Sequence, residues 1–318
     1  MNRLKFTIET NINIKKIKNI ILKFKKNNNF NKKKIYWDYF SNPFGKTKFF
    51  LAKHDDLILG MLVCYKQIYI NNKKKFKGYR IQDVITDREL IKKLIKNGKS
   101  LSTKNKKGIF DNLILKLNNF IKKNSEINLG FANHLAFPYW VRNNWQEISL
   151  FPLFEKKLKT IENFSLKYNK IKKFDLTHEK LFLKSLNNKI NIFWNKKYLN
   201  WRYINNPRSK YNAYEFFLKK KLIGYVVLKE YTSDKEKIGH ICQIVAKTKY
   251  KKDIIKFSNN FFLKKEISKL SLWCSEYNLM KNIGFKKEFP LNKKIVYSGK
   301  LNSKKLNFDI NMGFSDIY

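Results

Sequence analysis

Hydrophobic residues fall into short runs separated by polar turns, and a few longer segments carry them at helical spacing. Apolar runs over residues 48–53 and 58–65 flank a polar His-Asp-Asp turn, which predicts a β-hairpin. The same rules give an ordered set of elements along the first half. They are a helix over 12–24, strands over 48–53, 58–65 and 80–86, a helix over 109–121, a strand over 127–131, and a short helix ending at Asn144 and Trp145.

The second half repeats this order. The segment at Trp37 reads Trp-Asp-Tyr-Phe-Ser-Asn-Pro, the segment at Trp201 reads Trp-Arg-Tyr-Ile-Asn-Asn-Pro, and the spacing of 164 residues persists without a gap to Gly60 and Gly224. The chain has only 6 Trp, 5 Pro and 11 Gly, so chance is an unsatisfactory explanation for their coincidence. The second set comprises strands over 213–218, 222–228 and 241–246, a helix over 254–263, a strand over 270–274, and a short helix ending at Gly284 and Phe285.

The repeat predicts two domains, residues 1–155 and 156–318, with the Lys-rich stretch 155–169 between them. A chain of 318 residues that is 43% hydrophobic has enough apolar material for two cores of ordinary size. The Trp-x-Tyr-x-x-Asn-Pro segments occur in both copies. We therefore interpret them as structural anchors of each hairpin.

The formal net charge of +45 raises the question of nucleic acid. The charge is spread evenly over both halves, whereas a nucleic-acid footprint is usually a patch or stripe. Lysine, asparagine, isoleucine and phenylalanine share AT-rich codons, so genome composition explains the bias at least as well as a polyanionic partner. Nucleic acid is therefore not a predicted partner, although the positive field favours anionic ligands such as CoA or a nucleotide-linked sugar.

The three cysteines lie far apart and the four histidines are scattered, which gives no metal-ligand spacing. Unpaired cysteines in apolar runs are typical of a reducing compartment. Lysine recurs throughout the N-terminal region, and no stretch approaches 18 uninterrupted apolar residues. We therefore expect a cytoplasmic protein without a bound metal, a signal core or a membrane span.

The end of the first copy has the residue spacing of a known pattern. Asn133, Ala136 and Trp140, followed by Asn144 and Trp145, have the spacing with which GNAT acyltransferases end their acyl-CoA core. The run Gly-Phe-Ala-Asn at 130–133 resembles the Gly-Phe-Pro-Asn signature of GNAT members associated with surface-polysaccharide biosynthesis. That branch begins its main helix with Arg-Gly-x-Gly-Ile-Phe, and this chain has Lys-Lys-Gly-Ile-Phe at 106–110. The resemblance implies an α/β class with mixed sheets, arranged as two tandem GNAT-like folds.

Within the first pattern, Trp140 stands where the family has Tyr, and Asn144 and Trp145 stand where it has Gly-Phe. Two further departures accompany the resemblance. Asn105 and Lys106 stand where the family has Arg and the first Gly, and about twenty residues at 87–107 separate the core strand from the phosphate loop. This insertion has a possible helix over 89–96, and an alternative register makes 99–103 the core strand in place of 80–86. The second copy has no glycine from Cys242 through Ile283, so we expect it to keep the fold without an acyl-CoA site.

The resemblance implies acetyl-CoA or another acyl-CoA as co-substrate, bound by backbone amides at a turn that leads into a helix. The predicted cofactor-binding residues are Lys106, Lys107, Gly108, Ile109, Phe110 and Asn133. Asp83, an acid within an apolar strand, is the candidate general base, and Tyr139 is the candidate acid for the leaving thiol. The alternatives are that Asp83 caps a turn or pairs with Arg80, and that Tyr139 and Trp140 pack in the core.

The function implied by the resemblance is acyl-CoA-dependent N-acyl transfer, by an acetyltransferase in the first instance. The acceptor is a small molecule or glycan precursor, such as an amino sugar of a surface glycan. A Fem-like transferase that takes its acyl group from aminoacyl-tRNA is the first alternative, and a non-catalytic GNAT scaffold or binding module is the second. The acyl group, the acceptor, the oligomeric state and the contribution of the second domain to catalysis stay open.

Overall fold

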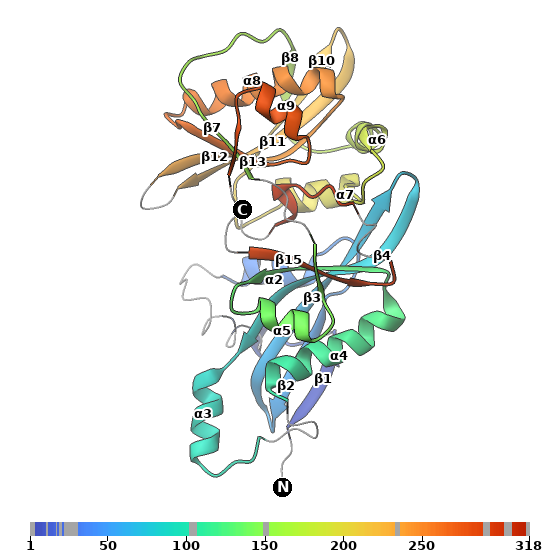
Figure 1. Cartoon of the computed structure of the whole chain (residues 1–318), viewed down its shortest axis with the longest axis vertical. Helices are drawn as coiled ribbons and strands as arrows, with labels where there is room; N and C mark the ends of the chain where they lie inside the picture. Colours follow the sequence, from blue (N-terminus) through green and yellow to red (C-terminus); the bar gives the residue numbers. More distant parts are fainter. Residues whose placement is uncertain are drawn as a thin grey trace. The chain divides into compact units, whose positions relative to one another are not determined.

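The computed structural model describes residues 4–315 except 11, 17, 19–20, 22–30, 102–106, 149–152, 233–235, 289–292 and 302–306. The chain divides into two compact units, each built around a mixed β-sheet with helices packed on it (Figure 1). The first consists of Met1–Tyr69, Phe76–Ser149 and Asn292–Lys305, and the second of Ile70–Lys75, Leu150–Leu291 and Leu306–Tyr318. The α/β class expected from the sequence is confirmed.

The sheet of the first unit has the strand order β1-β2-β3-β4-β5-β15-β6. Strands β4 and β5 run parallel to each other, whereas β15 runs antiparallel to both β5 and β6. The elements that build it are β1 (Lys5–Glu9), α2 (Lys32–Phe40), β2 (Lys48–His54), β3 (Leu57–Asn71), β4 (Lys74–Thr86), α3 (Arg88–Lys96), α4 (Ile109–Asn124), β5 (Ile127–Asn133), α5 (Phe137–Arg142), β6 (Gln146–Ile148) and β15 (Lys293–Gly299).

The sheet of the second unit has the strand order β14-β7-β13-β12-β11-β10-β8. Its parallel pair is β12 and β13, and β7 runs antiparallel to β13 and β14. The elements of this half are β7 (Leu153–Lys157), β8 (Lys167–Lys170), α6 (Leu176–Ser185), β9 (Asn191–Ile192), α7 (Lys196–Leu199), the π-helical turn η1 (Asn200–Ile204), β10 (Asn212–Leu218), β11 (Lys221–Thr232), β12 (Lys237–Ala246), α8 (Thr248–Leu263), β13 (Lys269–Trp273), α9 (Tyr277–Asn282), β14 (Lys286–Glu288) and the 3-10 turn η3 (Met312–Phe314).

Strands β7 and β15 exchange sheets between the two halves of the chain. Strand β7 follows β6 in sequence but pairs with β13 and β14, and β15 follows β14 but pairs with β5 and β6. Each sheet therefore includes a strand from the other half, and the short strand β9 also pairs with β3. The stretch 155–169, expected to bridge the halves, supplies the end of β7 and the start of β8, with a segment outside any strand between them.

The internal repeat is visible in the strand registers. Gly60 pairs with Ala52, and Gly224 pairs with Phe216, in each case immediately before a bulge of the hairpin. A Cβ atom on Gly60 would lie 2.9 Å from an isoleucine of α4, and one on Gly224 would lie 2.5 Å from an isoleucine of α8. The equivalence of the two glycines is confirmed, and their physical role is to let the main helix approach the sheet closely.

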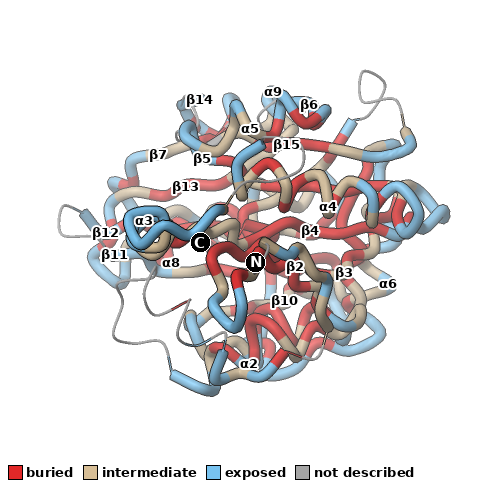
Figure 2. Tube along the Cα trace, turned by 90° about the horizontal axis from the view of Figure 1, so that it is seen from below, coloured by how far each residue is buried: buried red, intermediate tan, exposed pale blue. Residues whose placement is uncertain are grey.

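Strand β2 is buried on both faces, which explains its continuous apolar run. Phe50 and Ala52 belong to a core cluster with α4 and α5, whereas Phe49 and Leu51 belong to one with α2. Successive side chains of a strand point to opposite faces, so the two clusters cover opposite sides of the sheet. Figure 2 shows the same pattern, with the strands largely buried and α3 exposed.

The insertion between β4 and α4 contains the expected helix, α3, whose N-cap is the Asp87 side chain. Residues 80–86 lie in β4, so the core strand is 80–86 and the alternative at 99–103 is wrong for its described residues, 99–101. Strand β4 begins earlier than expected, at Lys74. The expected helix over 12–24 falls largely outside the described residues. None of the described helices is long and apolar enough to cross a membrane.

Candidate functional site

The two parallel strands of the first unit stop pairing before either strand ends. Their register runs from Gly78 and Ile127 to Ile81 and Gly130, and no further, although both strands are described throughout. Strand β4 continues to Thr86, while the rest of β5 pairs with β15 on its other side. Beyond Ile81, β4 therefore has backbone N–H and C=O groups that β5 does not use, and such groups can pair with an extended ligand.

Helix α4 begins at a glycine turn without a side-chain cap. The N-cap is Gly108, whose extended backbone has φ −64° and ψ 167° and provides no side-chain cap. The Asn112 side chain donates to the carbonyl oxygens of Lys107 and Gly108, each at 2.9 Å, which fixes the turn. Among the described residues, a Cβ atom on Gly108 would meet only a carboxylate oxygen of Asp111, at 3.9 Å. A helix start without a side-chain cap suits an anionic group.

Asp111 lies in the first turn of α4 and was not among the residues singled out from the sequence. Its buried carboxylate accepts a hydrogen bond from Arg142 Nε at 2.8 Å, a second from the Arg142 Nη2 group, and a third from Asn143 Nδ2 at 2.8 Å. A carboxylate here complements the helix dipole, and a two-pronged arginine contact is among the stronger ion pairs. The pairing joins α4 to α5 and offsets the negative charge beside the open turn.

Phe110 and Tyr139, predicted for cofactor binding and acid catalysis, are brought together in an aromatic group. Their ring centroids are 4.7 Å apart in an edge-to-face arrangement. Phe110 also contacts Trp140, which packs on Trp145 at 4.7 Å. The Arg142 guanidinium lies 4.0 Å from the Tyr139 ring centroid. Tyr139 is half-buried and packs against the core cluster of this unit.

The other predicted binding residues lie at the start of α4 and at the end of β5. Lys106 lies outside the described residues, and Lys107 is exposed. Ile109 packs over the glycine of β3. The Asn133 side chain accepts a hydrogen bond from the backbone N–H of Ala136 at 2.8 Å, so it shapes the turn from β5 into α5.

Asp83 lies on β4 just beyond the point where pairing with β5 ends. Its carboxylate accepts a hydrogen bond from the hydroxyl of Tyr39 on α2. Burial and the neighbouring negative charge of Asp83 raise the pKa of Tyr39 well above its ordinary value, so this hydroxyl keeps its proton and remains a donor. Tyr39 stacks on Tyr65, and the Arg80 guanidinium lies 5.2 Å from the Tyr65 ring centroid.

The sequence interpretation placed Tyr39 in a purely structural motif and missed its contact with the candidate base. The two residues are 44 positions apart, and nothing local in the sequence links them. One signal was available. Both copies keep the tyrosine, as Tyr39 and Tyr203, but only the first copy has an acid on the neighbouring strand.

The counterpart of Asp83 in the second unit is Gln243. In each unit the carbonyl oxygen of a strand residue lies next to the repeated glycine. A Cβ atom built on Gly60 would lie 3.3 Å from the Ile85 oxygen, and one built on Gly224 would lie 3.1 Å from the Val245 oxygen. Asp83 and Gln243 each lie two residues before that carbonyl. The second copy thus has a carboxamide at the position where the first has a carboxylate.

The second unit repeats the end of strand pairing but not the open turn. Strands β12 and β13 pair only as far as Ile241 and Leu272, as in the first unit. A single residue, Lys247, then separates β12 from α8, and the helix starts where a phosphate-binding loop would need to bend. Lys247 is the N-cap of α8, with φ −64° and no side-chain cap.

No protein-family model and no curated protein sequence matches this chain. Solved structures resemble it over most of its length. A GCN5-related N-acetyltransferase from Anabaena variabilis has a TM-score of 0.68 at 12% identity, covering 93% of this chain and 73% of its own. A probable N-acyltransferase from Enterococcus faecalis has a TM-score of 0.65 at 8% identity, covering 92% and 71%.

A third similar structure is the N-myristoyltransferase of Saccharomyces cerevisiae with bound myristoyl-CoA. It has a TM-score of 0.57 at 11% identity and covers 92% of this chain and 78% of its own. The chain has the GNAT fold. The order of strands and helices in each unit is the one that the sequence repeat predicted.

Proposed function

We propose that this GNAT protein is an acyl-CoA-dependent N-acyltransferase whose acyl-CoA site lies in the first unit. One observation carries the proposal: the pairing of β4 and β5 ends beside the uncapped start of α4. The fold neighbours support it, because one is an N-acetyltransferase and another is an N-myristoyltransferase with bound myristoyl-CoA. The net charge of +45 adds a general attraction for the anionic co-substrate.

The proposed site uses backbone groups more than side chains. The pantetheine arm would pair with the unused edge of β4, and the diphosphate would accept hydrogen bonds from the first amides of α4. The residues in contact would be Lys106, Lys107, Gly108, Ile109, Phe110 and Asn133. The open space at Gly108 fits this role, and Arg142 compensates the Asp111 carboxylate nearby.

In the proposed reaction an amine nitrogen attacks the thioester carbonyl, the C–S bond breaks, and the thiolate leaves. Asp83 takes the proton that the amine loses, and the Tyr39 hydroxyl orients the Asp83 carboxylate through its hydrogen bond. Tyr139 supplies a proton to the departing sulfur. The acceptor is a small amine or glycan precursor, with an amino sugar suggested by the Gly-Phe-Ala-Asn run at 130–133.

The binding part of the proposal is tested by thermal unfolding with acetyl-CoA and with myristoyl-CoA. A ligand at a hundred times its dissociation constant stabilises the folded state by about 2.7 kcal/mol. Gly108→Val should abolish this stabilisation, because its side chain would cover the helix-start amides. The matched control is Lys247→Val, at the corresponding N-cap of the second unit with the same φ. Equal stabilisation of wild type and Gly108→Val would place the site elsewhere.

The catalytic part is tested by steady-state kinetics on an amine acceptor. Asp83→Asn should lower kcat by about a hundredfold or more with KM for acyl-CoA little changed. Tyr39→Phe should lower kcat less, because it removes only the hydrogen bond that orients the Asp83 carboxylate. Asp56→Asn, in the exposed turn of the first hairpin, is the control. A kcat for Asp83→Asn equal to that of the control would exclude Asp83 as the base.

A further inference from the structure

The second unit contains a cavity at the point where β12 and β13 stop pairing. Its walls come from the end of β12, the segment after β13, the first turn of α8, the end of α6 and the C-terminal residues near Asn311. All of these segments belong to the second unit. The cavity therefore occupies the region that corresponds, in the first unit, to the surroundings of Asp83.

Gln243 is the most informative residue of this cavity. Its side chain is only 2% exposed, and within the described part of the chain neither Nε2 nor Oε1 has a hydrogen-bond partner. Buried carboxamides in folded proteins are nearly always hydrogen-bonded, because loss of water without replacement is unfavourable. Gln243 lines the cavity, so its unpaired donor and acceptor indicate a ligand that provides the opposite pair, as an amide does.

Two further atoms of the cavity wall are acceptors without a described partner. Glu276 pairs with Lys251 through Oε1, and its other oxygen, Oε2, is buried and unpaired. The Oδ1 atom of Asn311 is also buried and unpaired. Asp309 lies beside them and accepts a hydrogen bond from Ser275. The wall thus has two carboxylates and one lysine, in a chain whose net charge is +45.

The polar groups of the cavity wall indicate which kind of ligand the cavity can bind. Unpaired acceptors and a local excess of carboxylate favour a donor-rich or cationic group, such as a primary ammonium. They disfavour the anionic diphosphate of CoA, and the immediate start of α8 after Lys247 leaves no phosphate loop. The second unit therefore has a site chemistry opposite to that of the first.

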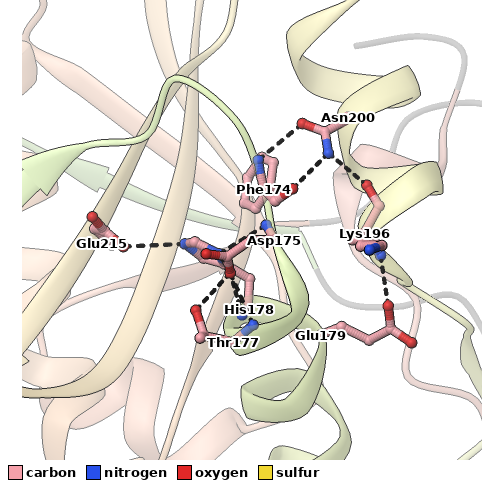
Figure 3. Close-up of polar contacts among 8 residues, drawn as sticks. All are labelled: Phe174, Asp175, Thr177, His178, Glu179, Lys196, Asn200 and Glu215. Atoms are coloured by element: carbon pink, nitrogen blue, oxygen red, sulfur yellow. Dashed lines mark hydrogen bonds and ion pairs between the residues drawn. The ribbon is translucent and has the colours of Figure 1, made fainter.

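The wall formed by α6 is held in place by polar contacts, shown in Figure 3. Asp175 caps the helix through Thr177 and His178, and the His178 ring lies between Asp175 and Glu215 of β10. Burial alone would raise the pKa of Asp175, but the hydrogen bonds from Thr177 and His178 lower it to about 2, so the cap is charged at neutral pH.

The far side of α6 is held in the same way. Glu179 accepts a hydrogen bond from the Lys196 backbone, and Asn200 bonds both backbone groups of Phe174. Helix α6 is thereby fixed to β10 and to the α7–η1 segment within this unit. The cavity wall that its end provides is positioned before any ligand arrives, which favours binding.

We propose that this cavity binds a small primary amine that also carries an amide group. The ammonium would be held by Glu276 and Asn311, and the amide would pair with the Gln243 carboxamide. This site lies wholly in the second unit and is independent of the acyl-CoA site proposed for the first. Its failure would leave that proposal unchanged.

The test is binding to the full-length protein, followed by thermal unfolding and by ligand-observed NMR. The probes are glycinamide and β-alaninamide, which carry both groups at two separations, with ethylamine and acetamide as probes of each group alone. At least one amino amide should bind saturably and about tenfold more tightly than either single-group probe. Absence of saturable binding by both amino amides at every concentration the protein tolerates would overturn the proposal.

Three variants connect the binding to the cavity. Gln243→Leu should weaken amino-amide binding at least about tenfold, while the unliganded protein unfolds at the same or a higher temperature, because an unpaired buried carboxamide has been removed. Glu276→Gln should weaken binding similarly and provides the test if Gln243→Leu does not fold. Glu230→Gln is the control, since Glu230 pairs with Lys265 in the same unit at 2.7 Å but outside the cavity wall. Unchanged binding in both cavity variants would refute the assignment.

Discussion

Mild acid should destabilise this protein through His240. This residue lies on β12, is 3% exposed, and its Nδ1 atom is 2.6 Å from the hydroxyl oxygen of Ser271. Burial, followed by the positive charges of Lys229 and Lys269, lowers the pKa of His240 from 6.5 to about 3. The folded protein therefore keeps this imidazole neutral under conditions in which the unfolded chain protonates it.

The sign and size follow from proton linkage. The folded pKa lies below the unfolded value, so the stability that the neutral imidazole provides is complete above pH 6.5 and is lost as the pH falls below it. At about pH 5 the unfolded histidine is almost fully protonated and the folded one is not. The pH is then about 1.5 units below the unfolded pKa, so the free energy of unfolding is lower by about 2 kcal/mol. This figure depends on the unfolded pKa alone while the folded pKa stays well below 5.

The measurement is urea denaturation of the wild type and of His240→Asn at about pH 7.5 and about pH 5. Comparison of the two proteins removes the contribution of every other titrating group. The stability of the wild type relative to the variant should fall by about 2 kcal/mol between the two conditions. His134→Asn, at an exposed histidine, is the control. Parallel pH dependence of wild type and His240→Asn would refute the reasoning.

Three further predictions concern the fold. Gly224→Ala should lower the free energy of unfolding by about 1–3 kcal/mol, because its Cβ would overlap a buried isoleucine of α8. Gly108→Ala should change the free energy of unfolding by about 0.5 kcal/mol or less, and urea denaturation measures both variants. Residues 1–155 expressed alone should lack cooperative thermal unfolding, because they lack β15, which joins β5 to the edge strand β6, and a cooperative transition would contradict the strand exchange. Arg142→Ala should lower stability by about 1–2 kcal/mol by leaving the buried Asp111 carboxylate with one described partner, and an unchanged melting temperature would show that solvent replaces the arginine.

The sequence was sufficient for features that arise from local pattern. The hairpins, the main helices and the parallel strand after each helix follow from apolar spacing, and the repeat of Trp, Pro and Gly identified two copies of one fold. Gly60 and Gly224 could be equated in advance because a glycine beneath a helix leaves a rare residue at a fixed position in both copies. These are short-range constraints, and each can be read within a window of a few tens of residues.

The strand exchange could not be read in this way. Strands β7 and β15 have the composition of ordinary short strands, and the residues that pair with them lie more than a hundred positions away in the chain. The same limit applies to the site. The contact of Tyr39 with Asp83 and the ion pair of Asp111 with Arg142 join residues 44 and 31 positions apart. Their geometry is a product of tertiary packing, which a single sequence does not specify locally.

The two copies differ where packing does not constrain them. The repeated glycine is held by the close approach of a helix in both units, so a side chain there would disturb the core. No described helix approaches in this way at the strand position two residues before Ile85 and Val245, and that position is Asp83 in one copy and Gln243 in the other. The N-cap of the main helix differs in the same way, with Gly108 in one copy and Lys247 in the other. A buried carboxamide without a partner opposes folding, so its presence in Gln243 is best explained by a ligand that the second copy binds for itself.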